Sequence, residues 1–139
     1  MADFALDPAF AATSHLVGDL PLCQVRLQDD ARYPWLVLIP RLPGLTEIEQ
    51  LSPADRTRLI EESVRAGQAV RALGGHLGHA VEKLNLGALG NVTAQLHLHV
   101  VGRRAADPAW PGPVWGHSPA EAYDNPAQAI AAAREALGL

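Results

Sequence analysis

The sequence predicts a single domain of mixed α and β class, in which a long helix packs on a β-sheet. Three observations lead to this prediction. An alternating segment at residues 23–28 and an apolar segment at residues 35–39 flank a polar turn, as the two strands of a hairpin do. A run with helical periodicity covers residues 52–75, and a segment of alternating side chains follows at residues 95–103. The length of 139 residues suits one domain and is too short for two.

Composition and charge restrict the class of partner. Hydrophobic residues make up 48% of the chain and charged residues 19%, which is ordinary for a globular protein. The net charge of −4 provides no broad positive field for a nucleic-acid polymer, so we expect any phosphorylated partner to be small.

Targeting and redox signals are sparse. The one cysteine, Cys23, cannot form an internal disulfide and is expected to be a buried, small apolar residue. The first 20 residues lack a basic leader with an apolar core, and no apolar run approaches the roughly 20 residues of a membrane-spanning helix. We therefore expect a cytoplasmic protein with no membrane contact.

The first half of the chain carries one helix signal and two strand signals. "DPAFAATS" at residues 7–14 begins like a helix, but only about two turns fit before Gly18. "CQVRLQ" at residues 23–28 alternates apolar and polar side chains, which favours a strand with one solvent-exposed face. "WLVLI" at residues 35–39 is apolar throughout and framed by prolines, as expected of a strand covered on both faces.

The long helix has clear start and stop signals. Ser52 can cap it, Asp55 favours its positive end, and Gly74 and Gly75 can end it. One face is expected to pack on the sheet; its members are Leu59, Ile60, Val64, Gly67, Val70 and Leu73.

The remaining elements follow in order. "KLNLGALG" at residues 83–90 is predicted to be a strand weakened by glycines, which is typical of a bulge or of a close ligand approach. The Pro/Gly-rich segment before residue 125 contains Trp110 and Trp115, which favours an ordered loop. Asn125 and Pro126 open a final helix, whose shared face is Ile130, Ala133 and Leu137.

The run "QLHLHVVGRR" at residues 95–104 carries the candidate chemistry. Successive side chains of a strand point to opposite faces, so Gln95, His97 and His99 share one face, and the intervening leucines face the core. Two such imidazoles lie about 6 to 7 Å apart, because a strand rises ~3.3 Å per residue. Both can therefore contact one phosphate-sized group.

Three interpretations of the histidine pair are open at this point. One histidine could attack as a neutral nucleophile while the other protonates a leaving group. The pair could instead lie on a solvated sheet face without chemistry. It could also bind zinc, for which His76 and His79 are the nearest further ligands in the sequence.

"QLHLHVV" resembles the signature of the histidine triad (HIT) superfamily, His-φ-His-φ-His-φ-φ with φ apolar, in which Gln95 replaces the first histidine. The flanks "WLVLIPRLPGLTEIEQLSPAD" and "NLGALGNVTAQLHLHVVGR" are also similar to that family. The resemblance covers a core of about residues 22–104 within a single domain of residues 1–139, and a Trp/Pro-rich loop and helix follow at residues 105–139.

The resemblance implies an α+β fold with an antiparallel sheet of about five strands, on which one long helix and a C-terminal helix pack. It also implies a homodimer. Members of the family hydrolyse or transfer nucleoside monophosphates from nucleoside phosphoramidates or dinucleoside polyphosphates, without a metal or other cofactor. A small nucleotide is thus the expected substrate.

Residue roles carry over by position. His97 inherits the nucleophile that attacks the α-phosphorus, and His99 inherits the last triad position, which contacts phosphate and leaving-group oxygens. Asn91 falls where many members place a phosphate-binding amide, and Asn85 lies on the strand beside the ribose-phosphate pocket. Gln95 can orient His97 or a phosphate oxygen by hydrogen bonds, but it cannot relay a proton.

Four further residues have two interpretations each. The backbone at Gly90 could approach a phosphate, or the glycine could mark a sheet bulge. Arg103 could neutralise a phosphate, although arginines at strand ends are more often solvated. Trp110 and Trp115 could stack on a base, although packing of the loop is the commoner role of such residues. Trp35 stands where many relatives carry a small residue or a histidine, so the base pocket should differ from theirs.

Two functions are therefore expected as alternatives. The first is a HIT-type nucleotide hydrolase or nucleotidyl transferase that works through a nucleotidyl-histidine on His97. The second is a nucleotide-binding module or sensor with little activity, because Gln95 replaces a triad histidine.

Overall fold

The computed structural model describes residues 3–139 and confirms the α+β class. All strand pairs of the single sheet are antiparallel. In sheet order the strands are β1 (Ser14–Asp19), β2 (Cys23–Gln28), β3 (Trp35–Pro40), β5 (Leu98–Arg103) and β4 (Lys83–Gly87). The edge strands are therefore β1 and β4, and β5 lies inside the sheet.

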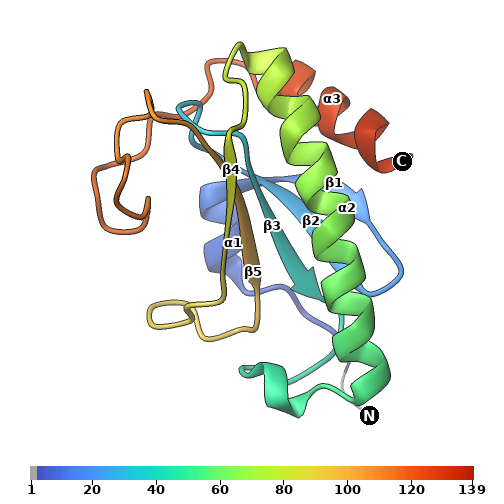
Figure 1. Ribbon diagram of the computed structural model, residues 1–139. Coiled ribbons are helices and arrows are strands. Elements are labelled where there is room, and N and C mark those ends of the chain that lie inside the picture. The colour runs from blue at the N-terminus through green and yellow to red at the C-terminus, as the bar shows by residue number, and fades with distance from the viewer. Residues whose placement is uncertain (1–2) are drawn as a thin grey trace.

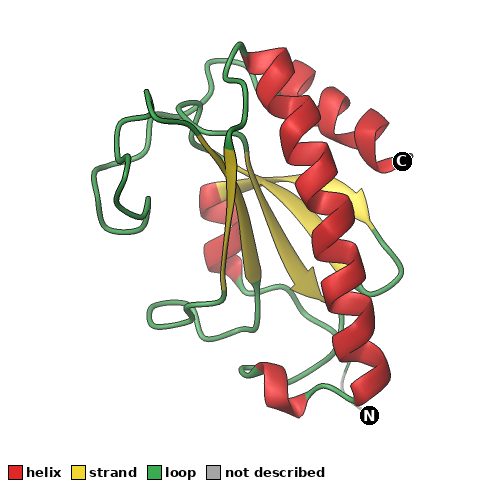
Figure 2. Cartoon of the chain, in the orientation of Figure 1, coloured by secondary structure: helices red, strands yellow, loops and turns green. Residues whose placement is uncertain are grey.

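Different elements cover the two faces of the sheet (Figures 1 and 2). The long helix α2 (Pro53–Leu77) and the C-terminal helix α3 (Ala127–Leu137) lie side by side on one face and enclose the main apolar core. The short helix α1 (Pro8–Thr13) and the loop after β5 cover the other face, where a second apolar cluster includes Phe10, Trp35 and Val114. The histidine side chains belong to this second face.

The start of α2 is as predicted, but its end is not. Ser52 caps the helix by accepting a hydrogen bond of 3.1 Å from the Asp55 N–H. The helix continues through the two glycines that were expected to end it and stops at Gly78, which adopts a left-handed φ of 74°. Gly74 is needed for packing, because a Cβ there would lie 2.6 Å from the carbonyl oxygen of His79.

The buried face of α2 was predicted correctly except at two positions. Ile60 and Val64 are 58% and 52% exposed, so their placement against the sheet was wrong. Polar and small residues hold the buried stripe instead, among them Glu62, whose carboxylate accepts the backbone N–H groups of Leu22 and Cys23, each at 2.8 Å. Because a polar side chain occupies a core position, a search for apolar periodicity alone does not find the buried face.

The hairpin of β2 and β3 is confirmed, and so are both short helices. Asp7 caps α1 by accepting from the Ala9 N–H at 2.9 Å, and Asn125 likewise accepts from the first residue of α3. Cys23 is fully buried, and burial raises the pKa of its thiol. Strand β1 was missed, because it begins directly after α1 and is interrupted by an irregularity between Leu16 and Gly18.

Within residues 3–139 the structure contains no helix whose length and apolar character would let it cross a membrane.

Candidate functional site

The histidine pair lies at the centre of the sheet, on the face covered by α1 and the C-terminal loop. His99 lies on β5 and is paired with Val37 of β3 on one side and Gly87 of β4 on the other. His97 directly precedes β5. Their ring centroids are 4.9 Å apart with an interplanar angle of 79°. The two histidines therefore share one face, as predicted, and their rings are in edge contact.

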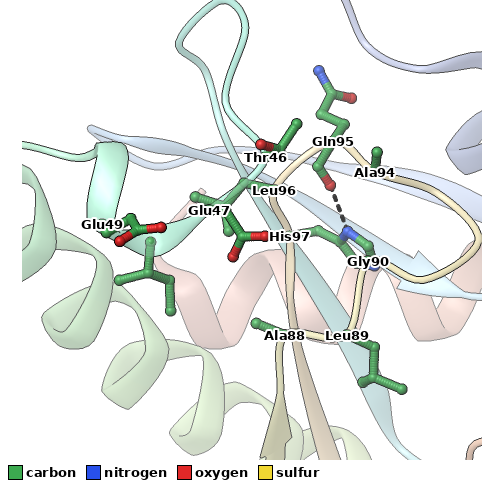
Figure 3. A pocket seen from close by; sticks show the side chains of 11 residues that line it. Thr46, Glu47, Glu49, Ala88, Leu89, Gly90, Ala94, Gln95, Leu96 and His97 are labelled. Atoms are coloured by element: carbon green, nitrogen blue, oxygen red, sulfur yellow. Dashed lines mark hydrogen bonds between the residues drawn. The ribbon is translucent and has the colours of Figure 1, made fainter.

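The protonation pattern of His97 follows from one hydrogen bond. Its Nδ1 lies 2.6 Å from the main-chain carbonyl oxygen of Gln95 (Figure 3). A carbonyl oxygen can only accept a hydrogen bond, so Nδ1 carries the proton and is the donor. The lone pair of a neutral His97 is consequently on Nε2, the nitrogen that would attack an electrophile.

His99 has the opposite arrangement. The indole Nε1–H of Trp35 donates to Nδ1 of His99 at 3.0 Å. An indole nitrogen is only a donor, so Nδ1 of His99 accepts and its proton is on Nε2. Burial, together with the nearby His97, lowers the pKa of His99 to about 3. His99 is therefore a neutral imidazole that offers an Nε2–H.

Two cavities meet at His97. The larger cavity has a volume of about 590 Å³, and the residues on its wall include Phe10, Gly90, Asn91, His97, His99 and Trp115. The smaller cavity, of about 180 Å³, lies between residues 46–49 and the loop that joins β4 to β5 (Figure 3). The first has mainly apolar walls and the size of a small-molecule site, whereas Glu47 and Glu49 border the second.

The side chain of Gln95 does not orient His97, in contrast to the expectation. Figure 3 shows the carboxamide pointing away from the imidazole, and only the main-chain carbonyl reaches the ring. The carboxamide oxygen accepts from the Asp7 N–H at 2.8 Å, and its nitrogen donates to the Ala5 carbonyl at 2.8 Å. Gln95 thus fastens the segment that leads into α1, and α1 places Phe10 with its ring centroid 4.8 Å from that of His97.

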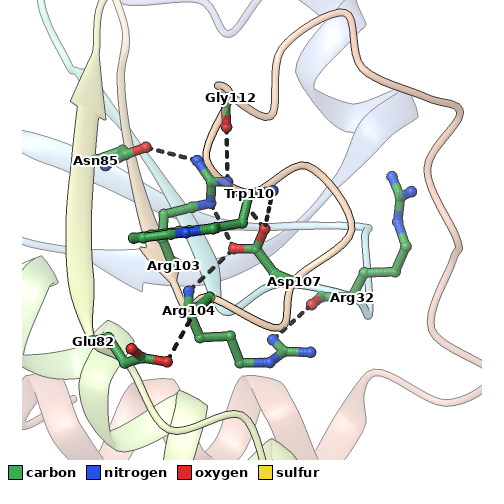
Figure 4. A network of polar contacts seen from close by, with 9 residues as sticks. Arg32, Glu82, Asn85, Arg103, Arg104, Asp107, Trp110 and Gly112 are labelled. Atoms are coloured by element: carbon green, nitrogen blue, oxygen red, sulfur yellow. Dashed lines mark hydrogen bonds and ion pairs between the residues drawn. The ribbon is translucent and has the colours of Figure 1, made fainter.

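Arg103 is buried, so the expectation of a solvated side chain was wrong. It is 1% exposed, and its guanidinium makes a two-pronged ion pair with Asp107 at 2.7 and 3.0 Å (Figure 4). It also donates to the side-chain oxygen of Asn85 and to the carbonyl of Gly112, each at 2.8 Å. Burial alone would raise the pKa of Asp107, but the hydrogen bonds from Arg103 and nearby backbone N–H groups hold it below its usual value.

This network, defined by Arg103, Asp107, Asn85 and Gly112, ties the C-terminal loop to β4 and β5. Arg103 and Asn85, both predicted to bind phosphate, are brought together, but they contact each other and the loop. Neither lines the larger cavity.

Gly90 and Asn91 do line the larger cavity, as the predicted phosphate-binding roles require. Gly90 has a left-handed φ of 72°, which a residue with a side chain would adopt only at a cost. A Cβ there would meet nothing closer than 3.8 Å, so the turn conformation and not crowding accounts for the glycine.

The tryptophans of the loop have separate positions. Trp110 packs over Arg103, whose guanidinium carbon is 5.7 Å from the ring, which agrees with the packing role. Trp115 lines the larger cavity with its ring 5.5 Å from that of His99, and its Nε1 has no hydrogen-bond partner. Its position leaves stacking on a ligand available.

Sequence reasoning missed two parts of the site. The contact of Phe10 with His97 and the hydrogen bond of Trp35 to His99 join residues 87 and 64 positions apart, and no local pattern signals either. His76 and His79 line neither cavity. In the part of the chain that the structure describes, no group of three or more His, Cys, Asp or Glu side chains could hold a metal ion.

The chain matches one protein family and several solved structures. A family model described as the HIT domain matches residues 9–106. The chain is similar to a solved histidine triad protein of Sinorhizobium meliloti 1021, with 40% identity over 94% of this chain and 93% of that one and a TM-score of 0.85. A histidine triad protein of Marinobacter aquaeolei VT8 is 38% identical over 99% and 98% of the two chains, with a TM-score of 0.90.

A third solved structure, a histidine triad protein of Bradyrhizobium japonicum, is 36% identical over 98% of this chain and 99% of that one, with a TM-score of 0.89. No curated protein matches the sequence of this chain. The family model covers most of the chain. This protein therefore belongs to the HIT domain family.

Proposed function

We propose that this protein is a nucleotide hydrolase or nucleotidyl transferase that forms a covalent nucleotidyl-histidine on His97. Membership of the HIT domain family supports a nucleotide-binding or nucleotide-hydrolysing protein. The observation that carries the finer proposal is the hydrogen bond from His97 Nδ1–H to the Gln95 carbonyl. It leaves Nε2 with a lone pair, on a residue that lines both cavities.

In the first step, the Nε2 lone pair of His97 attacks the α-phosphorus and forms a P–N bond. The bond from phosphorus to the leaving group breaks, and the leaving group takes its electron pair. The imidazole then carries a positive charge that the Gln95 carbonyl stabilises through Nδ1–H, because a hydrogen bond to a charged donor is stronger than one to a neutral donor.

In the second step, water or another acceptor attacks the same phosphorus. The P–N bond breaks, its electrons return to Nε2, and the proton of the attacking water is released. His97 is thereby restored as a neutral imidazole for the next turnover.

Neutral hydrogen-bond donors would hold the phosphate. Lys and Arg are missing from the described walls of both cavities. The donors on the wall of the larger cavity include the Nε2–H of His99 and the side-chain amide of Asn91, beside the turn at Gly90. Preorganised neutral donors of this kind can stabilise charge that develops on phosphate oxygens.

The test compares wild type with His97→Ala and with His76→Ala, which changes an exposed histidine that lines neither cavity. AMP release from adenosine phosphoramidates and dinucleoside polyphosphates is measured without added metal, and acid-quenched samples are examined by mass spectrometry for an adenylyl group. We expect turnover and a His97 adduct in wild type and His76→Ala, and neither in His97→Ala. Equal turnover in all three proteins would remove His97 from the mechanism.

The alternative of an inactive binding module rested on Gln95, and the structure weakens that argument. Since the main chain of Gln95 orients His97, loss of a titrating side chain at this position does not disturb the nucleophile. Gln95→His should therefore give little gain in activity. AMP binding by calorimetry, with no turnover by wild type and a large gain in Gln95→His, would instead establish the binding module.

A further inference from the structure

The hydrogen bond between Trp35 and His99 restricts what His99 can do. The indole Nε1–H points its proton at Nδ1 of His99, at a distance of 3.0 Å. Protonation of that nitrogen would place two N–H groups against each other, and Trp35 cannot turn into an acceptor because indole has only a donor. The restriction is permanent, since an indole does not titrate in the range where proteins are folded.

The surroundings of His99 offer no compensation for a positive charge. Val37 of β3 and Gly87 of β4 flank it in the sheet, and Trp35 and Trp115 contact its ring. The described group that faces it and can titrate is His97, which would repel a second charge. Among residues 3–139 no carboxylate forms an ion pair with this ring, whereas a catalytic imidazolium usually has such a partner.

We propose that Trp35 is a positioning residue that keeps His99 a neutral Nε2–H donor, and that the site thereby selects substrates whose leaving group departs as a stabilised oxyanion. Phosphate, polyphosphate, carboxylate and phenolate leaving groups belong to this class, and alkylamines do not. The selection rests on the proposed function, whereas the state of His99 does not.

The chemistry of the bond that breaks explains the selection. When a phosphoanhydride is cleaved, the P–O bond breaks and the oxygen keeps both electrons. The product anion accepts a hydrogen bond from His99 Nε2–H, and no proton is transferred. When an alkyl phosphoramidate is cleaved, the nitrogen must gain a proton as the P–N bond breaks. A neutral His99 could supply it only by becoming an imidazolate anion, so general acid catalysis from this residue is lost.

The first test reads the tautomer of His99 directly in the folded protein. Ring-nitrogen chemical shifts are recorded by ¹⁵N NMR from pH 5 to 8 in wild type, with His99→Gln for assignment. We expect an Nε2–H tautomer that does not titrate over this range. An Nδ1–H tautomer, or a protonation midpoint near the ordinary histidine value of about 6.5, would overturn the proposal without any need for a variant of Trp35.

Two variants then assign the effect to the hydrogen bond. Trp35→Phe removes the donor and retains an apolar ring, and we expect the pKa of His99 to rise and both tautomers to be populated. Trp115→Phe is the matched control, because it removes a second indole N–H that contacts the same ring without a hydrogen bond to it. An equal change in both variants would mean that packing, and not the Trp35 donor, controls His99.

The second test measures the leaving-group preference. Values of kcat/KM at pH 5.5 are compared for an adenosine dinucleoside polyphosphate and an AMP alkyl phosphoramidate. Wild type should favour the anhydride, and Trp35→Phe should shift the ratio toward the amine by about tenfold or more, because His99 can then act as an acid. Equal loss with both substrates would overturn the selection.

Failure of the inference and failure of the function give different results. Wild-type turnover that treats amine and oxyanion leaving groups alike would overturn the selection and leave the nucleotidyl-histidine in place. No turnover and no His97 adduct with any substrate would overturn the proposed function and the selection together, and the NMR measurement would still decide the role of Trp35.

Discussion

His97 and His99 carry their protons on opposite ring nitrogens, although their rings are in contact with centroids 4.9 Å apart. The difference comes from two neighbours that are not themselves acids or bases: the carbonyl of Gln95, which accepts, and the indole of Trp35, which donates. Two identical side chains thereby present different groups, a lone pair on Nε2 of His97 and an Nε2–H on His99.

The buried neutral state of His99 should make the protein less stable in acid. The folded pKa is about 3 and the ordinary value is 6.5, so the unfolded chain binds a proton in this interval that the folded chain does not. The contribution of His99 is fully present above pH 6.5 and is lost as the pH falls toward 3, with a slope of at most about 1.4 kcal/mol per pH unit.

Urea unfolding of wild type and His99→Gln between pH 4 and 8 measures this effect. Glutamine does not titrate, so the free energy of unfolding should fall less steeply on acidification in the variant. Carboxylates that protonate in both proteins cancel in the difference. Parallel curves for the two proteins would show that His99 is protonated while folded.

Breaking the ion pair of Arg103 with Asp107 should release the C-terminal loop. Asp107→Asn keeps the shape of the side chain but leaves the buried guanidinium without its counter-charge, which typically costs about 3 to 5 kcal/mol. We expect a lower denaturation midpoint and a change in tryptophan fluorescence, because the loop carries Trp110 and Trp115.

Asp55→Asn provides the control for this prediction. Asp55 forms an ion pair of 3.0 Å with Arg58 on the surface of α2, and Arg58 is largely exposed. Loss of such a pair at the start of a helix should cost about 1 kcal/mol or less. A similar loss in the two variants would contradict a special role of the buried pair.

The carboxamide of Gln95 should hold the N-terminal segment against the site. In Gln95→Glu the carboxylate can still accept from the Asp7 N–H but has no proton to donate to the Ala5 carbonyl. One lost hydrogen bond of about 1 kcal/mol should speed amide hydrogen exchange in residues 5–10 by about fivefold.

Gln128→Glu makes the same substitution at an exposed position of α3 and should leave exchange in that segment unchanged. The His97 ring should keep its tautomer in Gln95→Glu, since the main-chain carbonyl is retained. Unaltered exchange in Gln95→Glu would show that the segment is held by Phe10 packing alone.

The homodimer expected from the family resemblance can be tested at the β4 edge of the sheet. Leu86 of β4 and Val64 of α2 are 48% and 52% exposed and border one shallow pocket, which a second copy of the chain could cover. Leu86→Lys should shift the molecular mass in solution toward that of a monomer, as measured by light scattering.

Leu16→Lys is the matched control, because Leu16 is 53% exposed on β1, the opposite edge strand. It should leave the assembly unchanged. A monomeric wild type would contradict the homodimer, and dissociation by Leu16→Lys alone would move the interface to β1.

Local patterns predicted most elements of the fold. The hairpin, the start of α2, the histidine strand and α3 each depend on periodicity and capping over a few neighbouring residues. The end of α2 could not be predicted in this way, because Gly74 is determined by contacts with residues after the helix. Ile60 and Val64 were misplaced because Glu62, paired with the backbone at the start of β2, occupies the buried stripe.

The candidate site was predictable as far as it lies on the segment from Gly90 to His99, where Gly90, Asn91 and the two histidines line the larger cavity. Alternation on β5 placed His97 and His99 together, and this was confirmed. The residues that surround the two imidazoles come from other elements. Trp35 of β3 sets the tautomer of His99, and Phe10 of α1 and Trp115 of the C-terminal loop contact the two rings. The burial of Arg103 likewise depends on a turn after the strand that folds Asp107 back over it.

Gly87 suggests a way to reshape the cavity by a paired substitution. A Cβ at this position would lie 2.8 Å from the indole of Trp115, so the ring occupies the space that any larger residue on β4 would need. Gly87→Ala should displace the indole, and Trp115→Phe in the same chain should make room for the added methyl group. The two substitutions should therefore compensate each other, so that residues 87 and 115 together determine the shape of the cavity wall beside His99.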